Sequence, residues 1–312
     1  MKRRKHKMEN IEVIGIDHGW SSCKTCNFAF VSGVREISTE PAIFDNVLEF
    51  GNKYYKIGGE RLKVKDTKVE DDNYYLLTLA GIAKELKHRG KKAATIILAV
   101  GLPLTRFGAE KSDFICYLSR EKEVTFLFEQ IEYQIVIEKV VVYPQCYGAV
   151  VDRLNRFPEK AIAIDLGSWT LDVMPIIKRN PDESMCVTFQ EGVITCIQQI
   201  NKECVRQLNG EIDEIQIEQF LINGGGNIPM KYQKIIISEV KKYCGEIFNH
   251  IREIGYNLDL IPMIFVGGGA SILKQFGGIE QTNIQFIEDV KANAIGFERL
   301  GKAYLSDLKK AR

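Results

Sequence analysis

Apolar and polar residues alternate along the chain in blocks that have the lengths of strands and helices. Short runs of β-branched and aliphatic residues predict strands at 11–17, 23–31, 35–41, 95–100, 161–165, 171–177, 185–190 and 262–266, and a strand pair within 123–142. Longer segments with apolar residues at helical spacing predict helices at 74–88, 112–121, 145–154, 195–208, 231–255 and 292–308. Each half of the chain mixes strands with helices, so the pattern predicts an α/β fold.

One nine-residue pattern occurs twice in this series. Residues 14–22 and 162–170 both begin Ile-x-Ile-Asp-x-Gly, so Asp17 and Asp165 lie 148 positions apart. Each copy predicts a buried strand that ends in Asp-x-Gly and a tight polar turn. Two such turns at half-chain separation indicate a duplicated domain with a ligand held between the halves.

The length of the chain fits two domains, since it has 312 residues and a mass of 35.5 kDa. We expect a disordered basic arm at 1–10, a first domain with a small insertion subdomain at 11–150, and a second domain at 151–312. The final helix is expected to pack back on the first domain. The arm is interpreted as a solvated tail, with an electrostatic tether to DNA or acidic lipid as the alternative.

Charge and cysteine content narrow the class of protein. With 42 basic and 41 acidic residues the chain is nearly neutral, so we expect no direct sequence-specific nucleic-acid binding. No apolar run approaches the roughly 20 residues of a transmembrane segment, and none follows the basic arm as in a secretory signal. Eight cysteines lie scattered through apolar segments, which predicts reduced thiols in a cytoplasmic protein.

The two turns carry small residues that suit the binding of an anion. Glycine, serine and threonine let consecutive backbone N–H groups point at a phosphate. These residues are Gly19, Ser21 and Ser22 in the first turn and Gly167, Ser168 and Thr170 in the second. Two such turns facing each other would clamp a phosphate chain from both sides.

Charged residues accompany both turns. Asp17 and Asp165 end their strands, where a carboxylate can hold a hydrated Mg²⁺ through its waters. Mg²⁺ keeps several waters and takes few carboxylates, so two at a distance are enough. Lys24 is expected to project from the strand after the first turn and to neutralise phosphate charge.

Three glycines, Gly267, Gly268 and Gly269, directly follow the strand expected at 262–266. Glycine lets a flat base or a ribose approach the backbone closely, and helix-start amides after the run would favour a phosphate. The chain has no Walker A pattern, which excludes P-loop chemistry. The other glycine triplet, at 224–226, is interpreted as a loop.

These features occur in the order that is found in one superfamily. The set resembles the actin/Hsp70/sugar-kinase ATPases, and within them the bacterial plasmid-segregation actins of the ParM/StbA type. The Asp-x-Gly-x-x-x-Cys-Lys of the first turn is close to that of actin, and the Asp-Leu-Gly-x-x-Thr-Leu-Asp of the second is similar to that of the ParM-like group. The five motifs would be phosphate 1 at 17–24, connect 1 at 144–149, phosphate 2 at 165–172, adenosine at 266–271 and connect 2 at 288–296.

The resemblance implies a fold, a ligand and a set of ligand-binding residues. The fold would be a duplicated actin-like (ribonuclease-H-like) α/β fold, with two domains around a nucleotide cleft. The ligand would be ATP, with GTP left open, together with Mg²⁺ held through water by Asp17 and Asp165. The residues implied to bind the nucleotide are Asp17, Gly19, Trp20, Ser21, Ser22, Lys24, Asp165, Gly167, Ser168, Trp169, Thr170, Gly267, Gly268, Gly269 and Ala270.

The resemblance assigns hydrolysis to two further residues. Gln145 stands where actins place a water-orienting Gln or Glu, and its amide can position a water but cannot act as a strong base, which suits slow hydrolysis. Asp172 matches a second acidic position that is tied to hydrolysis in the ParM-like group. For both residues, ordinary turn or cap chemistry is the alternative.

Three aromatic side chains depart from the pattern of the superfamily. Trp20 and Trp169, the two tryptophans of the chain, both fall in phosphate turns where small residues are usual. They either face away into packing or narrow the site. His18 is also unusual, and its position predicts an exposed, inert side chain.

The resemblance makes a filament-forming ATPase the leading functional hypothesis. ATP would favour assembly, hydrolysis would weaken subunit contacts, and a separate DNA-binding adaptor would link the polymer to plasmid or phage DNA. One alternative is a small-molecule, sugar-type kinase of the same superfamily, although no sugar-recognition signature is found. The other is a nucleotide-binding scaffold that does not hydrolyse its ligand.

Overall fold

The computed structural model describes residues 11–157 and 159–311, so the basic arm lies outside the described residues. The chain divides into two compact units. The first comprises Met1–Val151 and Lys291–Arg312, and the second comprises Asp152–Val290. Each unit has its own sheet and its own apolar core.

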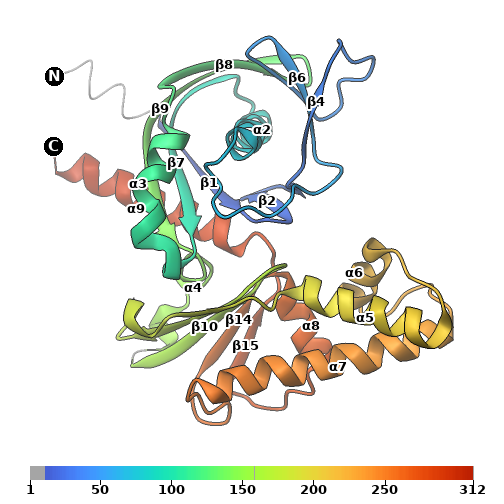
Figure 1. Cartoon of the computed structure of the whole chain (residues 1–312). Coiled ribbons are helices and arrows are strands. Elements are labelled where there is room, and N and C mark those ends of the chain that lie inside the picture. The colour runs from blue at the N-terminus through green and yellow to red at the C-terminus, as the bar shows by residue number, and fades with distance from the viewer. Residues whose placement is uncertain (1–10, 158, 312) are drawn as a thin grey trace. The chain divides into compact units, whose positions relative to one another are not determined.

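A nine-stranded sheet forms the framework of the first unit (Figure 1). Its order is β3-β2-β1-β7-β9-β8-β5-β6-β4, in which β1, β7 and β9 run parallel and the other pairs run antiparallel. The strands are β1 Ile11–His18, β2 Ser22–Thr25, β3 Ala29–Val31, β4 Val34–Ile37, β5 Val47–Phe50, β6 Lys53–Ile57, β7 Ala93–Leu102, β8 Glu123–Phe128 and β9 Ile131–Pro144.

This sheet curves around the helix α2, Asn73–His88 (Figure 1). Every residue of α2 from Tyr74 to Ala83 is buried, as expected of a helix that is apolar on all sides and enclosed by other elements. The other helices of the unit are α3 Leu104–Leu118, α4 Tyr147–Val150 and α9 Ala292–Lys310.

Helix α9 lies against β1, β7 and α4, and glycines allow the close approach. A Cβ added at Gly15 of β1 would lie 2.1 Å from the carbonyl oxygen of Ala294. A Cβ at Gly296 would lie 1.8 Å from the carbonyl oxygen of Gly148 in α4. Any larger residue at these positions would push α9 away from the sheet and from α4.

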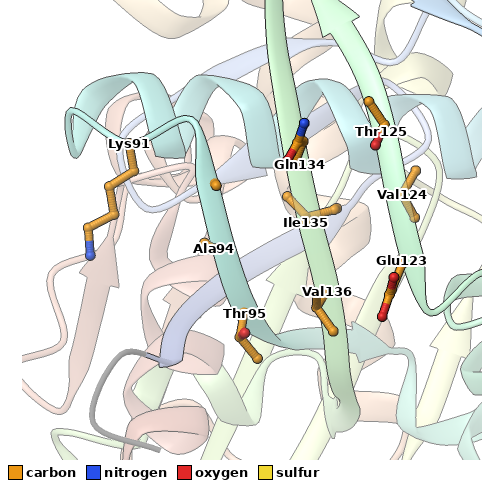
Figure 2. Close-up of a pocket in the computed structure, with 10 residues that line it drawn as sticks. Lys91, Ala94, Thr95, Glu123, Val124, Thr125, Gln134, Ile135 and Val136 are labelled. Atoms are coloured by element: carbon orange, nitrogen blue, oxygen red, sulfur yellow. The ribbon is translucent and has the colours of Figure 1, made fainter. Parts of the chain in front are cut away.

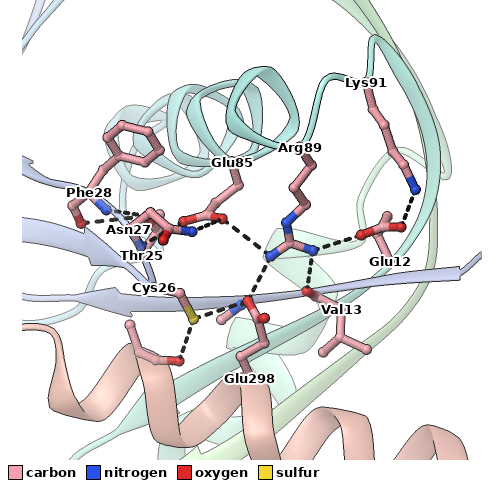
Figure 3. A network of polar contacts seen from close by, with 12 residues as sticks. Glu12, Val13, Thr25, Cys26, Asn27, Phe28, Glu85, Arg89, Lys91 and Glu298 are labelled. Atoms are coloured by element: carbon pink, nitrogen blue, oxygen red, sulfur yellow. Dashed lines mark hydrogen bonds and ion pairs between the residues drawn. The ribbon is translucent and has the colours of Figure 1, made fainter.

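A network of charged side chains also holds α9 to β1 and α2 (Figure 3). Arg89, just after α2, donates to Glu12 of β1 and to Glu298 of α9, each at 2.8 Å, and pairs with Glu85 at 3.2 Å. Cys26 donates its thiol proton to Glu298 at 3.1 Å. Burial alone would raise the pKa of Glu298, but Lys302, Cys26 and Arg89 hold it below its usual value. The carboxylate therefore stays charged inside the unit.

The second unit is built around a six-stranded sheet. Five strands follow the order β12-β11-β10-β14-β15, and the sixth, β13, pairs with β11. Its strands are β10 Lys160–Leu166, β11 Leu171–Ile177, β12 Asn180–Pro181, β13 Val187–Phe189, β14 Met263–Val266 and β15 Ile284–Ile287. Its helices are α5 Val193–Leu208, α6 Glu214–Asn223, α7 Met230–Glu253 and α8 Gly268–Phe276, with short 3-10 turns at Leu154–Arg156 and Glu183–Met185. Their buried faces form one apolar core with β10, β11 and β14.

The two units repeat one topology. In each, the first strand pairs antiparallel with the second and parallel with a later strand, which pairs parallel with one more: β2-β1-β7-β9 and β11-β10-β14-β15. The hairpins share one register, because Asp17 faces Lys24 and Asp165 faces Asp172. The predicted duplicated α/β fold is confirmed.

Several predicted boundaries were wrong. The strand expected at 23–31 is broken by a turn into β2 and β3, because the backbone N–H of Thr25 bonds to Phe28 and Glu85 holds Asn27. Helix α3 begins eight residues before the predicted 112, and the helix predicted at 145–154 is reduced to α4. The strands and helices that no predicted range covers are β5, β6, β12, β15, α6 and α8.

None of the helices in the described part of the chain is long and apolar enough to cross a membrane. All eight cysteines lie in the described residues, and none forms a disulfide there.

Candidate functional site

Asp17 is the centre of the polar contacts at the first turn. It is the residue before the last of β1, and its side chain is almost wholly buried. Gln145 donates from Nε2 to Asp17 Oδ1 at 2.8 Å, and Lys24 Nζ lies 3.6 Å from Oδ2. The fold therefore brings two predicted phosphate-1 residues and the predicted connect-1 residue together.

The backbone of the first turn is fixed by a serine that the sequence did not single out. Ser32 donates from Oγ to the carbonyl oxygen of Gly19 at 2.7 Å and from its N–H to that of Ser21 at 3.0 Å. A Cβ added at Gly19 would lie 2.6 Å from Lys24 Nζ, so the ammonium sits directly beside the turn. Only glycine leaves room for the lysine in this position.

The two connect motifs meet within the first unit. Gln145 follows β9, and its N–H donates to the carbonyl oxygen of Leu102 at the end of β7 (2.8 Å). The next residue, Cys146, has a φ of +68° and donates its N–H to Asn293 Oδ1 at the start of α9 (2.9 Å). This strained residue is held by a side chain from connect 2, which directs the chain from β9 into α4.

The second turn is held by a different set of contacts. The N–H of Gly167 donates to the carbonyl oxygen of Thr170 at 2.9 Å. Thr170 donates from Oγ1 to Asp172 at 2.9 Å, and Thr188 of β13 does so at 2.6 Å. Hydroxyl groups thus face Asp172, at the register position that Lys24 occupies in the first hairpin.

The start of α5 is hydrogen-bonded to the carbonyl groups of the second turn. The N–H groups of Val193 and Ile194 donate to the carbonyl oxygens of Gly167 and Ser168, at 3.0 and 2.9 Å. The N–H of Gly192 donates to Trp169 at 3.1 Å. These first amides of the helix are bonded to the turn, so they fix its shape and do not face a ligand.

The glycine run lies beside the second turn in the same unit. Asp165 pairs with Val266, the last residue of β14. Gly267 has a φ of +82°, and a Cβ there would lie 3.0 Å from Asp165 Oδ1. Gly269 packs so closely on Leu166 that a Cβ would lie 2.4 Å from its side chain. The remaining residues of the predicted run, Gly268 and Ala270, belong to the first turn of α8.

The two tryptophans differ in their surroundings. Trp20 packs on Tyr74 with an edge-to-face ring contact at 5.7 Å, and Lys68 Nζ lies 5.3 Å from its ring. Trp169 is 37 % exposed. His18 is fully buried, where the sequence predicted an exposed side chain, because the start of α2 covers it: His18 Nε2 lies 2.7 Å from Thr78 Oγ1.

No group of three or more His, Cys, Asp or Glu side chains that could hold a metal ion occurs among residues 11–157 and 159–311. A single carboxylate at each turn fits Mg²⁺, which keeps most of its waters and takes further ligands from a bound phosphate. It does not fit a metal that needs a full set of protein ligands.

A shallow groove of about 700 Å³ lies in the first unit, away from the Asp17 turn, on the face of β7, β9 and β8 (Figure 2). Its lining includes Thr95, Glu123 and Gln134 and none of the predicted site residues. Thr95 pairs with Ile11, at the start of β1, whereas Asp17 lies near the end of that strand. Ligands of such sheets bind at the carboxyl ends of the parallel strands, so the turns remain the better site.

Four residues that the sequence did not mark support these contacts. Ser32 and Thr188 come from strand ends and edge strands, and only their pairing partners bring them to the turns. Asn293 lies in the predicted connect 2 motif, where a polar residue at the start of a helix was the available signal. Lys68 comes from a polar segment without periodicity and gave no signal.

Comparisons with known proteins agree with this arrangement. The model of the N-terminal domain of actin-like proteins matches residues 15–148. The chain is similar to the crystal structure of Ta0583, an archaeal actin homologue, with a TM-score of 0.77 at 20% identity over 94% of this chain and 99% of that one. That homologue has also been solved in complex with ADP. No curated protein sequence matches the chain.

Two ParM structures are similar to the same extent. The apo ParM protein of pSK41 has a TM-score of 0.73 at 17% identity, over 96% of this chain and 99% of that one. A 15-stranded ParM filament from Clostridium botulinum has a TM-score of 0.73 at 20% identity, over 94% and 99%. The model of the family's N-terminal domain thus matches residues 15–148, and the chain as a whole has the fold of these archaeal actin homologues and ParM proteins.

Proposed function

We propose that this chain binds and slowly hydrolyses ATP with Mg²⁺ and assembles into filaments in a nucleotide-dependent way. The observation that carries the proposal is the set of contacts around Asp17, where Gln145 and Lys24 converge on one buried carboxylate beside the first turn. The ADP complex of the archaeal homologue and the filament of the ParM relative support the ligand and the assembly.

Both Asp-x-Gly turns would contribute to one nucleotide site. Asp17 and Asp165 would hold the waters of Mg²⁺, which neutralises phosphate charge when it is bound. Lys24 would add a positive charge at the phosphates, and the small residues of each turn would present backbone N–H groups to them. Gly267 lacks a side chain beside Asp165, where a Cβ would lie 3.0 Å from Oδ1, and this suits the close approach of the ribose and base.

Gln145 is proposed to orient the attacking water. Its Nε2 donates to Asp17, which fixes the amide plane and leaves Oε1 to accept a hydrogen bond from a water. An amide is a weak base, so the expected hydrolysis is slow and limited by positioning. Asp172 is proposed as a second contributor, because Thr170 and Thr188 hold its carboxylate in one orientation.

The cellular role proposed for the filament is the segregation of plasmid or phage DNA. A DNA-binding adaptor would connect the polymer to the DNA, which agrees with the near-neutral charge of the chain. Nucleotide controls such a polymer when the assembled and free states bind it with different affinity. The proposed setting is the cytoplasm.

Light scattering at 90° and phosphate release, recorded after mixing with Mg-ATP, test this function. Filaments that form with ATP, release phosphate and disappear when EDTA removes Mg²⁺ would support it. Turnover that requires an added sugar and gives no scattering would identify a kinase instead. Nucleotide binding without scattering or turnover would identify a scaffold.

A matched pair of variants separates the chemistry from assembly. Gln145→Ala should slow phosphate release at least about tenfold, since the water loses its orienting group, while ATP-dependent scattering is kept. Gln134→Ala, at an exposed position of the same strand β9, serves as the control. Equal release rates for the two variants would remove Gln145 from the mechanism.

A further inference from the structure

Several buried polar atoms without partners gather behind the first turn. His18 Nδ1, Ser21 Oγ and the Tyr74 hydroxyl are buried and have no hydrogen-bond partner among the described residues. The rings of Tyr74 and His18 lie 6.2 Å apart, and Tyr74 also contacts Trp20, the residue before Ser21. Buried polar groups are normally paired, so this set indicates a missing polar ligand or water.

Lys68 adds a positive charge to the same place. Its side chain is 6 % exposed, and its ammonium lies 5.3 Å from the ring of Trp20 and 5.8 Å from that of Tyr74. Among the described residues, Asp17 and Glu110 attract its charge, but Asp17 pairs with Lys24 and Glu110 pairs with Arg106. A buried ammonium that lies over ring faces is costly unless an anion joins it.

The charge state of Lys68 supports an anionic ligand. Burial lowers its pKa to about 8, while Asp17 and Glu110 act in the opposite direction. The group is therefore still largely protonated at pH 7. Lys24 differs, because it already faces Asp17 at 3.6 Å.

The donors among these side chains suit an oxyanion. The ammonium of Lys68 and the hydroxyls of Ser21 and Tyr74 can all donate hydrogen bonds. Thr78 donates from Oγ1 to the carbonyl oxygen of Tyr74 and so accepts from His18 Nε2–H, which leaves Nδ1 of His18 as an acceptor for water. Three donors and one positive charge match a phosphate oxygen with an accompanying water.

We propose that Lys68 is a further phosphate-binding residue, which reaches from outside the five motifs to the terminal phosphate of the bound triphosphate. The inference rests on the proposed function, since it needs a nucleotide at the first turn. Lys24 would serve the phosphates common to ADP and ATP, and Lys68 would serve the one that ATP alone carries. The chain would thereby distinguish the two nucleotides by charge.

Calorimetric titration with Mg-ADP, a non-hydrolysable Mg-ATP analogue and inorganic phosphate alone tests this assignment. Lys68→Met keeps the length of the side chain over the two rings and removes the charge. It should weaken binding of the analogue at least about tenfold and leave ADP within about twofold. Lys63→Met, at an exposed position of the same segment, should change neither affinity.

The other outcomes of the titration each contradict a stated part of the proposal. Equal losses for ADP and the analogue, or no loss for either, would overturn the assignment. If the wild type binds phosphate alone and Lys68→Met abolishes only that binding, the ligand is free phosphate and the assignment to the nucleotide is wrong. If the wild type binds no nucleotide, the proposed function itself fails.

Two further measurements distinguish a loss of binding from a failure of Lys68→Met to fold. Removal of an unpaired buried charge should leave the melting temperature of Lys68→Met equal to that of the wild type or higher. In a Trp169→Phe protein with Lys68 intact, the fluorescence of Trp20 should change more with the analogue than with ADP, because the ammonium moves from its ring. Equal changes with both nucleotides would overturn the proposal without any variant at Lys68.

Discussion

The hairpins β1–β2 and β10–β11 share one backbone plan and one register but differ in the charges they carry. In the first, Asp17 faces Lys24, and Arg89 reaches Glu12 from outside the sheet. In the second, Asp165 faces Asp172. A lysine and an aspartate therefore occupy equivalent positions in the two copies.

This difference indicates how a duplicated fold divides its tasks. The apolar strand and the Asp-x-Gly turn are common to both copies, because they specify the sheet and the bend. The charged partners are specific to each copy. The first hairpin supplies the cation of Lys24, and the second supplies the carboxylate of Asp172, which hydroxyl groups orient.

The largest effect is expected from breaking the charged network of the first hairpin. Arg89→Met leaves Glu12, Glu85 and Glu298 without their shared cation, and removal of one partner of a buried ion pair costs about 3–5 kcal/mol. Urea unfolding followed by circular dichroism measures the loss. Arg206→Met, which breaks an exposed pair with Glu203, should change little, and an equal loss in both variants would contradict the account.

The next effect concerns the cation that only the first hairpin has. Lys24→Met should weaken the binding of ADP and ATP by about 10- to 100-fold, since a charge-assisted contact with the phosphates is lost. Lys160→Met, an exposed lysine at the start of β10, is the matched control. Calorimetry that gives the same affinity for both variants would refute a phosphate role for Lys24.

Acid should destabilise the first unit more than the second. His18 is buried and uncharged, and its burial, with a smaller contribution from Lys68, lowers its pKa from 6.5 to about 3. The unfolded chain therefore binds an extra proton between pH 6.5 and 3, so stability falls as the pH is lowered through that range. At pH 5 the loss is about 2 kcal/mol.

The equivalent position in the second hairpin carries Leu166, which cannot titrate. His18→Leu copies that residue into the first hairpin and should remove this part of the pH dependence. Urea unfolding of both proteins at pH 7 and pH 5 measures the difference. Identical losses on acidification would show that His18 does not titrate on unfolding.

The smallest effect is expected at the carboxylate that replaces Lys24 in the second hairpin. Asp172→Asn should lower phosphate release about tenfold, because the amide cannot accept from both Thr170 and Thr188 in the same way. Nucleotide affinity should stay within about twofold. Asp182→Asn, in an exposed turn of the same unit, is the control, and an unchanged release rate in Asp172→Asn would reduce its role to turn structure.

The sequence predicted what repeats and missed what depends on long-range contacts. The strand and turn at Asp17 and at Asp165 were visible because alternation and spacing are local. Strand β6 was missed within the polar segment from 51 to 73, because its burial changes from exposed Lys53 through half-buried residues to buried Ile57 and does not alternate. The early start of α3 was missed because only Phe114 and Leu118 of this helix are buried.

The same contrast between local patterns and long-range contacts explains which site residues could be predicted. Lys24 and Gln145 could be placed from the motifs, and the structure brings both to Asp17. The burial of His18 and the position of Lys68 depend on how α2 and the segment before it fold over the turn. No local pattern records such a contact, which is why the sequence predicted an exposed histidine.

The central proposal is that the binding of one nucleotide depends on both Asp-x-Gly turns. Calorimetry with Mg-ADP on the wild type, Asp17→Ala and Asp165→Ala tests it most directly. The account predicts one nucleotide per chain and, for each variant alone, a loss of affinity of about 100-fold or more. Two nucleotides per chain, or wild-type affinity in either variant, would contradict it.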